Sequence, residues 1–177
     1  RLAPDGAPRF YGVRPVADDF GARVQAALAH ARAARATITV LPELALTDAE
    51  HAALLADPEI AALPLVVLGS RHVARPRDSD APGRNLATLV AHGRVVAEHA
   101  KMSDYFLRDG GVHRYEHIAP GDTVEVLLSE RLSLAMVVCK DLLRADWQNL
   151  IAQLAPRLLL VPAMSVEYAD FLSFAER

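Results

Sequence analysis

Short apolar runs alternate with amphipathic stretches along most of the chain. Apolar residues recur at helical spacing from Phe20 to Ala31, which predicts a helix capped by Asp18 or Asp19. Further helices are predicted after the capping-box pattern at 47–50, over 145–154, and over 167–177. The runs that predict strands are 10–16, 37–41, 64–69, 85–91, 94–100, 123–128, 132–138 and 158–161.

Strands and helices alternate at both ends of the chain, and a hairpin with its turn at His92-Gly93 lies between them. This order predicts an α/β architecture in which helices cover the outer faces of mixed β-sheets. Residues 75–84 have the composition of a loop. The segment 101–121 contains Gly110-Gly111 and Pro120-Gly121, which predicts a long surface loop of the kind that often carries function.

Composition limits the classes of protein to consider. The 177 residues suit one domain, and a hydrophobic content of 52% supports a packed core. A net charge of −3 without a basic patch argues against nucleic-acid binding. No run of 18 apolar residues predicts a membrane span. A single cysteine, Cys139, cannot form an internal disulfide or a cysteine-rich zinc site and is compatible with the cytoplasm.

Three side chains capable of chemistry stand at the ends of predicted strands. Glu43 follows the strand at 37–41, Lys101 follows the hairpin strand, and Cys139 ends the strand at 132–138. Strand ends are where open α/β sheets gather their sites, and a carboxylate, an ammonium and a thiol that meet there would form an activated nucleophile. Taken singly, each also fits a structural role. Cys139 could be a small core residue, Lys101 a surface charge and Glu43 a solvated loop residue.

The segments around these residues resemble those of the carbon–nitrogen hydrolase superfamily, the nitrilase-type amidases. Residues 39–47 resemble the segment around that family's general-base glutamate, 93–101 its hairpin ending in a lysine, and 134–141 its strand ending in Cys-x-Asp. Glu116, upstream of Pro120-Gly121, matches its second glutamate, and 160–165 matches the strand after the nucleophile's helix. These five matches follow the family's order along the chain.

The resemblance implies the four-layer α-β-β-α fold and a thiol hydrolase that acts on an amide or nitrile of a small molecule, without a cofactor or metal. Cys139 would attack the carbon, Glu43 would take the thiol proton, and Lys101 would stabilise the oxyanion before a thioester hydrolyses or passes on its acyl group. Glu116 would position Lys101 or the substrate. We expect the first three groups within about 3–5 Å of one another and a thiolate favoured by the Lys101 charge. The resemblance also implies a homo-oligomer.

Two features depart from the family pattern. The residue after the nucleophile is Lys140, where an aromatic or acidic residue is usual, and a second cation there would either favour an acidic substrate or point away. The family domain is also longer, so residues 1–177 are interpreted as one carbon–nitrogen hydrolase-like domain that lacks a C-terminal part. A catalytically inactive homologue that serves as a binding or assembly module is therefore a second hypothesis.

The same region offers a third hypothesis. His113-Arg114-Tyr115-Glu116-His117 has the His-x-x-Glu-His order of inverted zinc proteases. That chemistry needs both histidines on one helix face, and the flanking glycine and proline pairs leave little room for such a helix. A polar loop is the favoured interpretation of this segment.

Overall fold

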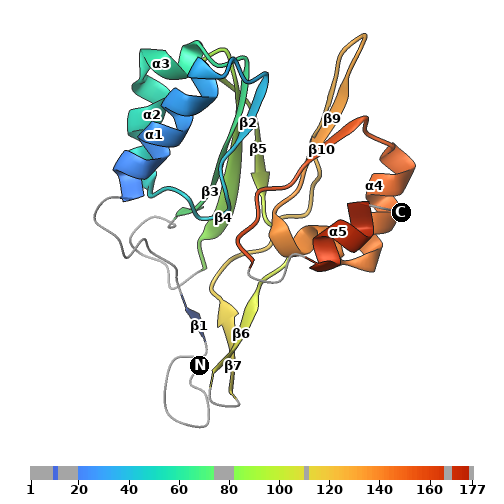
Figure 1. Ribbon diagram of the computed structural model, residues 1–177. Helices are drawn as coiled ribbons and strands as arrows, with labels where there is room; N and C mark the ends of the chain where they lie inside the picture. Colours follow the sequence, from blue (N-terminus) through green and yellow to red (C-terminus); the bar gives the residue numbers. More distant parts are fainter. Residues whose placement is uncertain (1–9, 12–19, 74–81, 110–111, 166–168, 176–177) are drawn as a thin grey trace.

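The computed structural model describes residues 10–11, 20–73, 82–109, 112–165 and 169–175. Its elements follow the predicted alternation (Figure 1). The helices are α1 (Phe20–Ala33), α2 (Asp48–Ala56), α3 (Pro58–Ala61), η1 (Cys139–Leu143, a 3-10 helix), α4 (Ala145–Leu154) and α5 (Ala169–Ala175). The strands are β1 (Phe10–Tyr11), β2 (Ile38–Val40), β3 (Leu65–Val73), β4 (Arg84–Ala91), β5 (Arg94–Ala100), β6 (Phe106–Asp109), β7 (Val112–Glu116), β8 (Val126–Leu128), β9 (Ser133–Met136) and β10 (Leu158–Leu160).

The described strands form three sheets, in the orders β2-β3-β4-β5, β10-β9-β8 and β1-β7-β6. The first two are mixed, as predicted: β2 and β3 are parallel, β3-β4-β5 is antiparallel, and β9 pairs in parallel with β10 but antiparallel with β8. A mixed sheet of this kind needs both hairpins and helical crossovers, which is what the predicted order supplies.

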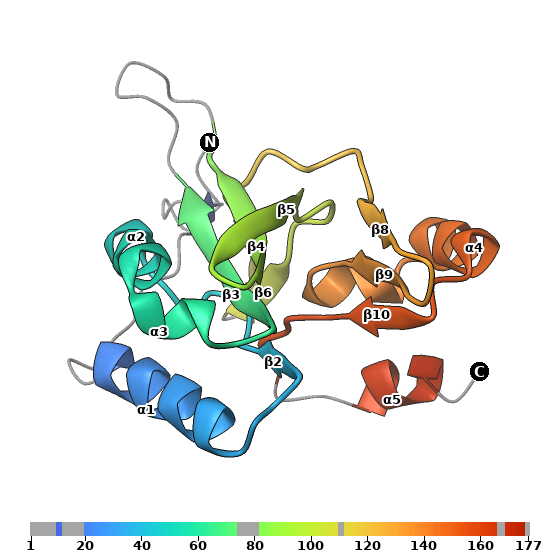
Figure 2. The same cartoon turned by 90° about the horizontal axis from the view of Figure 1, so that it is seen from above.

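Side chains that alternate along the strands build a four-layer packing. Val66 of β3 and Val90 of β4 face α1, α2 and α3, whereas Val67 and Leu89 face the second sheet. That sheet contributes residues such as Met136 to the shared core, and its far face packs on α4 and α5. Figure 2 shows the resulting order of helices, sheet, sheet and helices. The predicted α-β-β-α fold is therefore confirmed.

Local signals explain why several elements begin and end where they do. The Thr47 side chain accepts a hydrogen bond from Glu50 N, and the Glu50 carboxylate accepts from Thr47 N, which completes the predicted capping box of α2. Helix α4 has the predicted bounds, 145–154, and the hairpin β4–β5 turns at His92-Gly93 with both residues at positive φ. Asp18, Asp19 and most of the predicted loop at 75–84 lie outside the described residues.

The prediction of a loop over 101–121 was wrong in part. Strands β6 and β7 pair as an antiparallel hairpin within it, in register from Phe106↔Tyr115 to Asp109↔Val112, and β1 joins β7 in parallel. The glycine pair that suggested a loop, Gly110-Gly111, lies outside the described residues. In Figure 1 this hairpin extends away from the other two sheets at one end of the molecule.

Among the described residues, no helix combines the length and the apolar character needed to cross a bilayer.

Candidate active site

The turn that carries Glu43 is fixed against the neighbouring strand. Leu41 N donates to Val67 O at 2.9 Å, and Leu44, at a φ of 55°, donates its N–H to Ser70 Oγ at 3.1 Å. Gly69 has a φ of +68°, and a Cβ there would lie 2.1 Å from the Pro42 carbonyl oxygen. Only glycine permits this conformation at such close approach. The Glu43 side chain is consequently held, and it is only 4% exposed.

Lys101 stands one residue beyond β5, at the centre of the buried charges. Its backbone N–H donates to Asn85 O at 2.8 Å, and its ammonium donates to Glu43 Oε1 and Glu116 Oε2, both at 2.7 Å. The lysine is 1% exposed. Burial alone would lower the pKa of Lys101, but the charges of Glu43 and Glu116 outweigh it and raise that pKa above its ordinary value. Lys101 is therefore a permanently charged group at this site.

Glu116, at the end of β7, is an anchored anion. Its Oε1 accepts from Asn85 Nδ2 at 2.8 Å and lies 2.8 Å from His72 Nε2, while Oε2 accepts from Lys101. Burial raises its pKa, but the hydrogen bond with His72 and the charge of Lys101 prevail and bring the pKa of Glu116 down to about 2. A carboxylate with its oxygens occupied in this way accepts no further proton near neutral pH.

Cys139 follows β9 of the β10-β9-β8 sheet and is the first residue of η1. It has a left-handed φ of 47°, an uncommon conformation for a residue with a Cβ and one that recurs at functional sites. Its backbone N–H donates to Pro162 O at 3.0 Å, and the side chain is 4% exposed. The strand–turn geometry therefore fixes the direction in which the thiol points.

The ionisation of this thiol differs from the expected one. Burial, the negative charge of Glu43 and the hydrogen bond to Glu43 together raise the pKa of Cys139 to about 12, and the opposing effect of Lys101 is smaller. The expectation of a thiolate favoured by Lys101 was therefore wrong. The thiol is neutral in the free site, and its proton faces a carboxylate.

One cavity of about 80 Å³ joins these groups. Its lining residues are Glu43, Leu44, Lys101, Tyr105, Leu107, Glu116, Cys139 and Met164. The structure thus brings together the four residues singled out from the sequence. The apolar lining comes partly from the segment 101–121, and Tyr105, Leu107 and Met164 are 43–54% exposed at the cavity.

Asp141 connects the backbones on both sides of the site. Its carboxylate accepts from Met102 N at 3.1 and 3.0 Å and from Val138 N at 3.4 Å, which are the residues next to Lys101 and Cys139. His99, also fully buried, has Nε2 3.5 Å from Asp141 Oδ2. Asp141 is the aspartate of the Cys-x-Asp motif, but the sequence alone predicts no role for it, because the sequence does not show which backbone amides it contacts.

Lys140 points away from the cavity. Its ammonium donates to Asp104 O at 3.1 Å and lies 4.9 Å from the centre of the Phe106 ring. Of the two alternatives for this departure from the family pattern, the structure favours the second, in which the cation is directed elsewhere.

The His-x-x-Glu-His segment does not form the helix that a zinc protease of this type requires. Residues 113–116 lie in β7, and Glu116 is occupied by Lys101, Asn85 and His72. His113 packs against the Phe106 ring, with ring centroids 5.0 Å apart. In the part of the chain that the structure describes, no group of three or more histidine, cysteine, aspartate or glutamate side chains could hold a metal ion.

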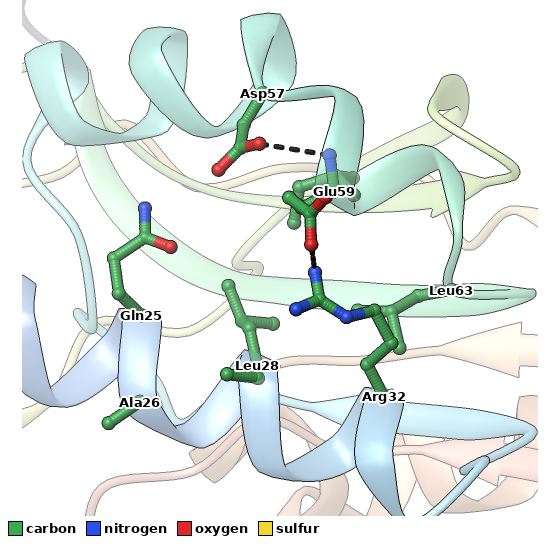
Figure 3. Close-up of a pocket in the computed structure, with 9 residues that line it drawn as sticks. Gln25, Ala26, Leu28, Arg32, Asp57, Glu59 and Leu63 are labelled. Carbon is green, nitrogen blue, oxygen red and sulfur yellow. Dashed lines mark hydrogen bonds and ion pairs between the residues drawn. The ribbon is translucent and has the colours of Figure 1, made fainter.

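A larger cavity, about 330 Å³, lies in the helical layer between α1 and α3 (Figure 3). Three of its polar side chains are engaged with one another or with the backbone: Arg32 pairs with Glu59, and Asp57 accepts a hydrogen bond from Glu59 N as the cap of α3. None of the four candidate residues lines it. The cavity with the larger volume is therefore not the one that the candidate residues line. We assign the candidate site to the smaller cavity, because its lining groups can carry out chemistry.

Solved structures identify the architecture. An amidase from Nesterenkonia AN1, a member of the nitrilase superfamily solved as a cysteine-to-alanine mutant, matches with a TM-score of 0.69 at 19% identity over 93% of this chain. The chain has the nitrilase-superfamily fold. It spans 66% of the length of that amidase. No protein-family model matches the sequence, and neither does any curated protein.

Two further structures show how widely the fold extends. An amidase from Nesterenkonia sp. matches with a TM-score of 0.68 at 20% identity, over 90% of this chain and 65% of its own. Glutamine-dependent NAD+ synthetase from Acinetobacter baumannii matches with a TM-score of 0.58 at 18% identity, over 89% of this chain and 31% of its own. Nitrilase-superfamily architecture thus occurs both alone and within a larger synthetase.

Proposed function

We propose that this chain carries the active site of a carbon–nitrogen hydrolase that uses Cys139 as its nucleophile on a small amide or nitrile. The observation that carries the proposal is one cavity shared by a thiol, the carboxylate that accepts the thiol's hydrogen bond, and a charged ammonium. Acyl transfer through a thiol needs a nucleophile, a base and an oxyanion stabiliser, and these three groups supply them.

The raised thiol pKa determines the first step. Because Cys139 is neutral, its proton passes to Glu43 as the sulfur bonds to the amide carbon and the carbonyl oxygen becomes an oxyanion. Two of the three Lys101 N–H groups are used by Glu43 and Glu116, which leaves the third for that oxyanion. The carbon–nitrogen bond then breaks, and the amine leaves with the proton held by Glu43.

The second half of the reaction uses the same groups in reverse. The thioester on Cys139 is attacked by water, which gives a proton to Glu43. When the carbon–sulfur bond breaks, that proton returns to the sulfur and a carboxylic acid is released. Glu116 takes no proton at either stage because its oxygens are held by Lys101, Asn85 and His72, so its part is to orient Lys101.

The cavity supports a small, uncharged substrate. A volume of about 80 Å³ corresponds to two or three water molecules at roughly 30 Å³ each, enough for a short acyl group. Its charged lining groups are two carboxylates and one ammonium, so an acidic substrate would meet a net negative charge. In a related observation, a glutamate-to-glutamine mutant of the Nesterenkonia amidase carries the acetamide moiety of fluoroacetamide covalently on its active-site cysteine.

The test is turnover by the complete protein on a panel of short-chain amides and nitriles, followed as ammonia release. We expect hydrolysis that survives treatment with a metal chelator and disappears in Cys139→Ala and in Glu43→Gln. As a matched control, Glu130→Gln removes an exposed carboxylate from the turn between β8 and β9 and should retain turnover. If the wild type neither releases ammonia nor forms an adduct with fluoroacetamide, the inactive-homologue hypothesis replaces this one.

We further propose that the protein acts as a homo-oligomer in the cytoplasm. Support comes from apolar side chains on the outer helical layer, where Leu154 of α4 is 42% exposed and Leu172 of α5 is 53% exposed. Packing of helical layers would cover such residues. Sedimentation of the complete protein tests this, and a monomer at micromolar concentration would contradict it.

A further inference from the structure

Asn85, the second residue of β4, is a fully enclosed polar side chain next to the candidate site. It is 0% exposed. Its Nδ2 donates to Glu43 Oε1 at 3.0 Å and to Glu116 Oε1 at 2.8 Å, so one amide nitrogen serves two carboxylates. These glutamates are 42 and 31 residues away in sequence and come from different elements. Asn85 thus links Glu43, the candidate base, to Glu116, the carboxylate that holds Lys101.

The orientation of the amide is determined by its surroundings. With Nδ2 toward the carboxylates, both N–H groups find acceptors; with Oδ1 there instead, three oxygens would face one another. This orientation leaves Asn85 Oδ1 buried without a hydrogen-bond partner among the described residues. Buried polar atoms are nearly always satisfied, so the exception indicates that the contacts of the amide nitrogen outweigh it.

Asn85 and Lys101 bridge the same two carboxylates. Lys101 donates to Glu43 Oε1 and Glu116 Oε2, and Asn85 donates to Oε1 of both, which closes a ring of four side chains. The Asn85 side chain is the shorter of the two bridges. The two backbones are also joined, because the backbone carbonyl of Asn85 accepts the Lys101 backbone N–H at 2.8 Å.

The ring has a directional consequence for Glu43. Asn85 and Lys101 both use Oε1, and neither engages Oε2, so the carboxylate is held by one oxygen and keeps the other for the thiol. A lysine alone fixes a carboxylate poorly, because an ammonium on a long stem is a rotatable point charge. The amide adds the second, directional constraint.

We propose that Asn85 is a positioning residue that fixes the Glu43 carboxylate between Lys101 and Cys139, so that its second oxygen meets the thiol. The expected effect on turnover rests on the proposed function. The placement of Glu43 against the thiol does not, and it can be measured without any substrate.

The experiment compares Asn85→Leu, which keeps the shape and removes both donors, with Thr88→Val. Thr88 lies on the same strand, is equally buried at 0%, and contacts His51 and Arg71, away from the cavity lining. Both variants lose buried polar contacts, but only the first loses the contact with Glu43. Asn85→Ser, a smaller change, is measured in parallel in case the leucine variant does not fold.

The readout is the pH profile of Cys139 reaction with methyl methanethiosulfonate in the complete protein. Once Glu43 is free to move from the thiol, the inflection should fall by about one pH unit or more in both Asn85 variants, which raises their rates at any fixed pH below it by about threefold or more. The inflection and the rates should stay in place in Thr88→Val. On a short-chain amide, the Asn85 variants should lose at least about tenfold in kcat with a smaller change in KM.

The outcomes separate the two proposals. An inflection that moves in the Asn85 variants alone supports the positioning role even if the wild type hydrolyses no amide, in which case the proposed function fails by itself. An inflection that does not move, or that moves equally in Thr88→Val, overturns the role of Asn85 whether or not the wild type is an amidase.

Discussion

Replacing Glu43 by glutamine should make the Cys139 thiol more reactive toward a small thiol reagent while it abolishes turnover. In the wild type, burial and Glu43 raise the pKa of Cys139 to about 12. Glutamine removes the negative charge and leaves Lys101, which favours the thiolate. The pKa of Cys139 should therefore fall, although burial continues to oppose ionisation.

The size of the wild-type effect follows from that pKa. At pH 8, an ordinary thiol with a pKa of about 8.5 is about one quarter thiolate, whereas a thiol with a pKa of about 12 is thiolate in about one molecule in ten thousand. The more basic thiolate is intrinsically more nucleophilic, with a Brønsted slope of about 0.4–0.5, which recovers about 25- to 55-fold. The wild-type thiol should thus react about 40- to 100-fold more slowly than an ordinary one, before any effect of limited access.

The assay is the rate of reaction with methyl methanethiosulfonate from pH 6 to about pH 10.5, analysed by the pH at which the rate levels off. With a pKa of about 12, the wild-type rate should still be rising at the top of this range. Restricted access scales every rate equally and leaves the inflection unchanged, so the profile isolates ionisation. Glu130→Gln controls for the loss of one negative charge at a distant site. A wild-type inflection at or below about pH 8.5, or a Glu43→Gln profile that matches the wild type, would refute the reasoning.

Three further outcomes are expected. Lys101→Met should lower the free energy of unfolding by about 3–5 kcal/mol, measured by urea denaturation, because it leaves two carboxylates buried without their cation; a loss below about 1 kcal/mol would contradict this. Glu116 has a pKa of about 2 in the folded protein against an ordinary value of 4.5, so its contribution to the free energy of unfolding, about 3 kcal/mol, is complete above about pH 4.5 and lost as the pH falls toward 2. Glu116→Gln should accordingly flatten the acid limb of stability between these values, and an unchanged limb would count against the assignment. Gly69→Ala should lower Tm by several degrees, since its Cβ would lie 2.1 Å from Pro42 O at a φ of +68°, and calorimetry showing no decrease would exclude that strain.

The sequence predicts the parts of this molecule that depend on local pattern. The capping box at Thr47, the bounds of α4 and the hairpin at His92-Gly93 all follow from signals within a few residues of each other. The placement of Glu43, Lys101 and Cys139 at strand ends also predicts their meeting, because the sheets bring those ends together. Their catalytic roles stay predictions.

The features missed from the sequence depend on distant partners. Asn85 has no reactive group, and its importance arises only when two glutamates from other elements reach the same amide nitrogen. The ionisation of Cys139 depends on whether Glu43 or Lys101 acts on it more strongly and on how deeply it is buried, which spacing does not reveal. Strands β6 and β7 are only four and five residues long and flank a glycine pair, so a loop was the stronger local interpretation.

The division of the site between two sheets has a consequence for biosynthesis. A ribosome delivers the chain from its N-terminus, so β2 to β7, with the base, the ammonium and the anchoring carboxylate, emerge before β9 and the thiol. The charged half of the site can assemble while no nucleophile is present. Any product interrupted before Cys139 therefore lacks the proposed nucleophile, and the candidate site is complete only when the second sheet docks on the first. Under the proposed function, turnover would therefore report the docking of the two sheets.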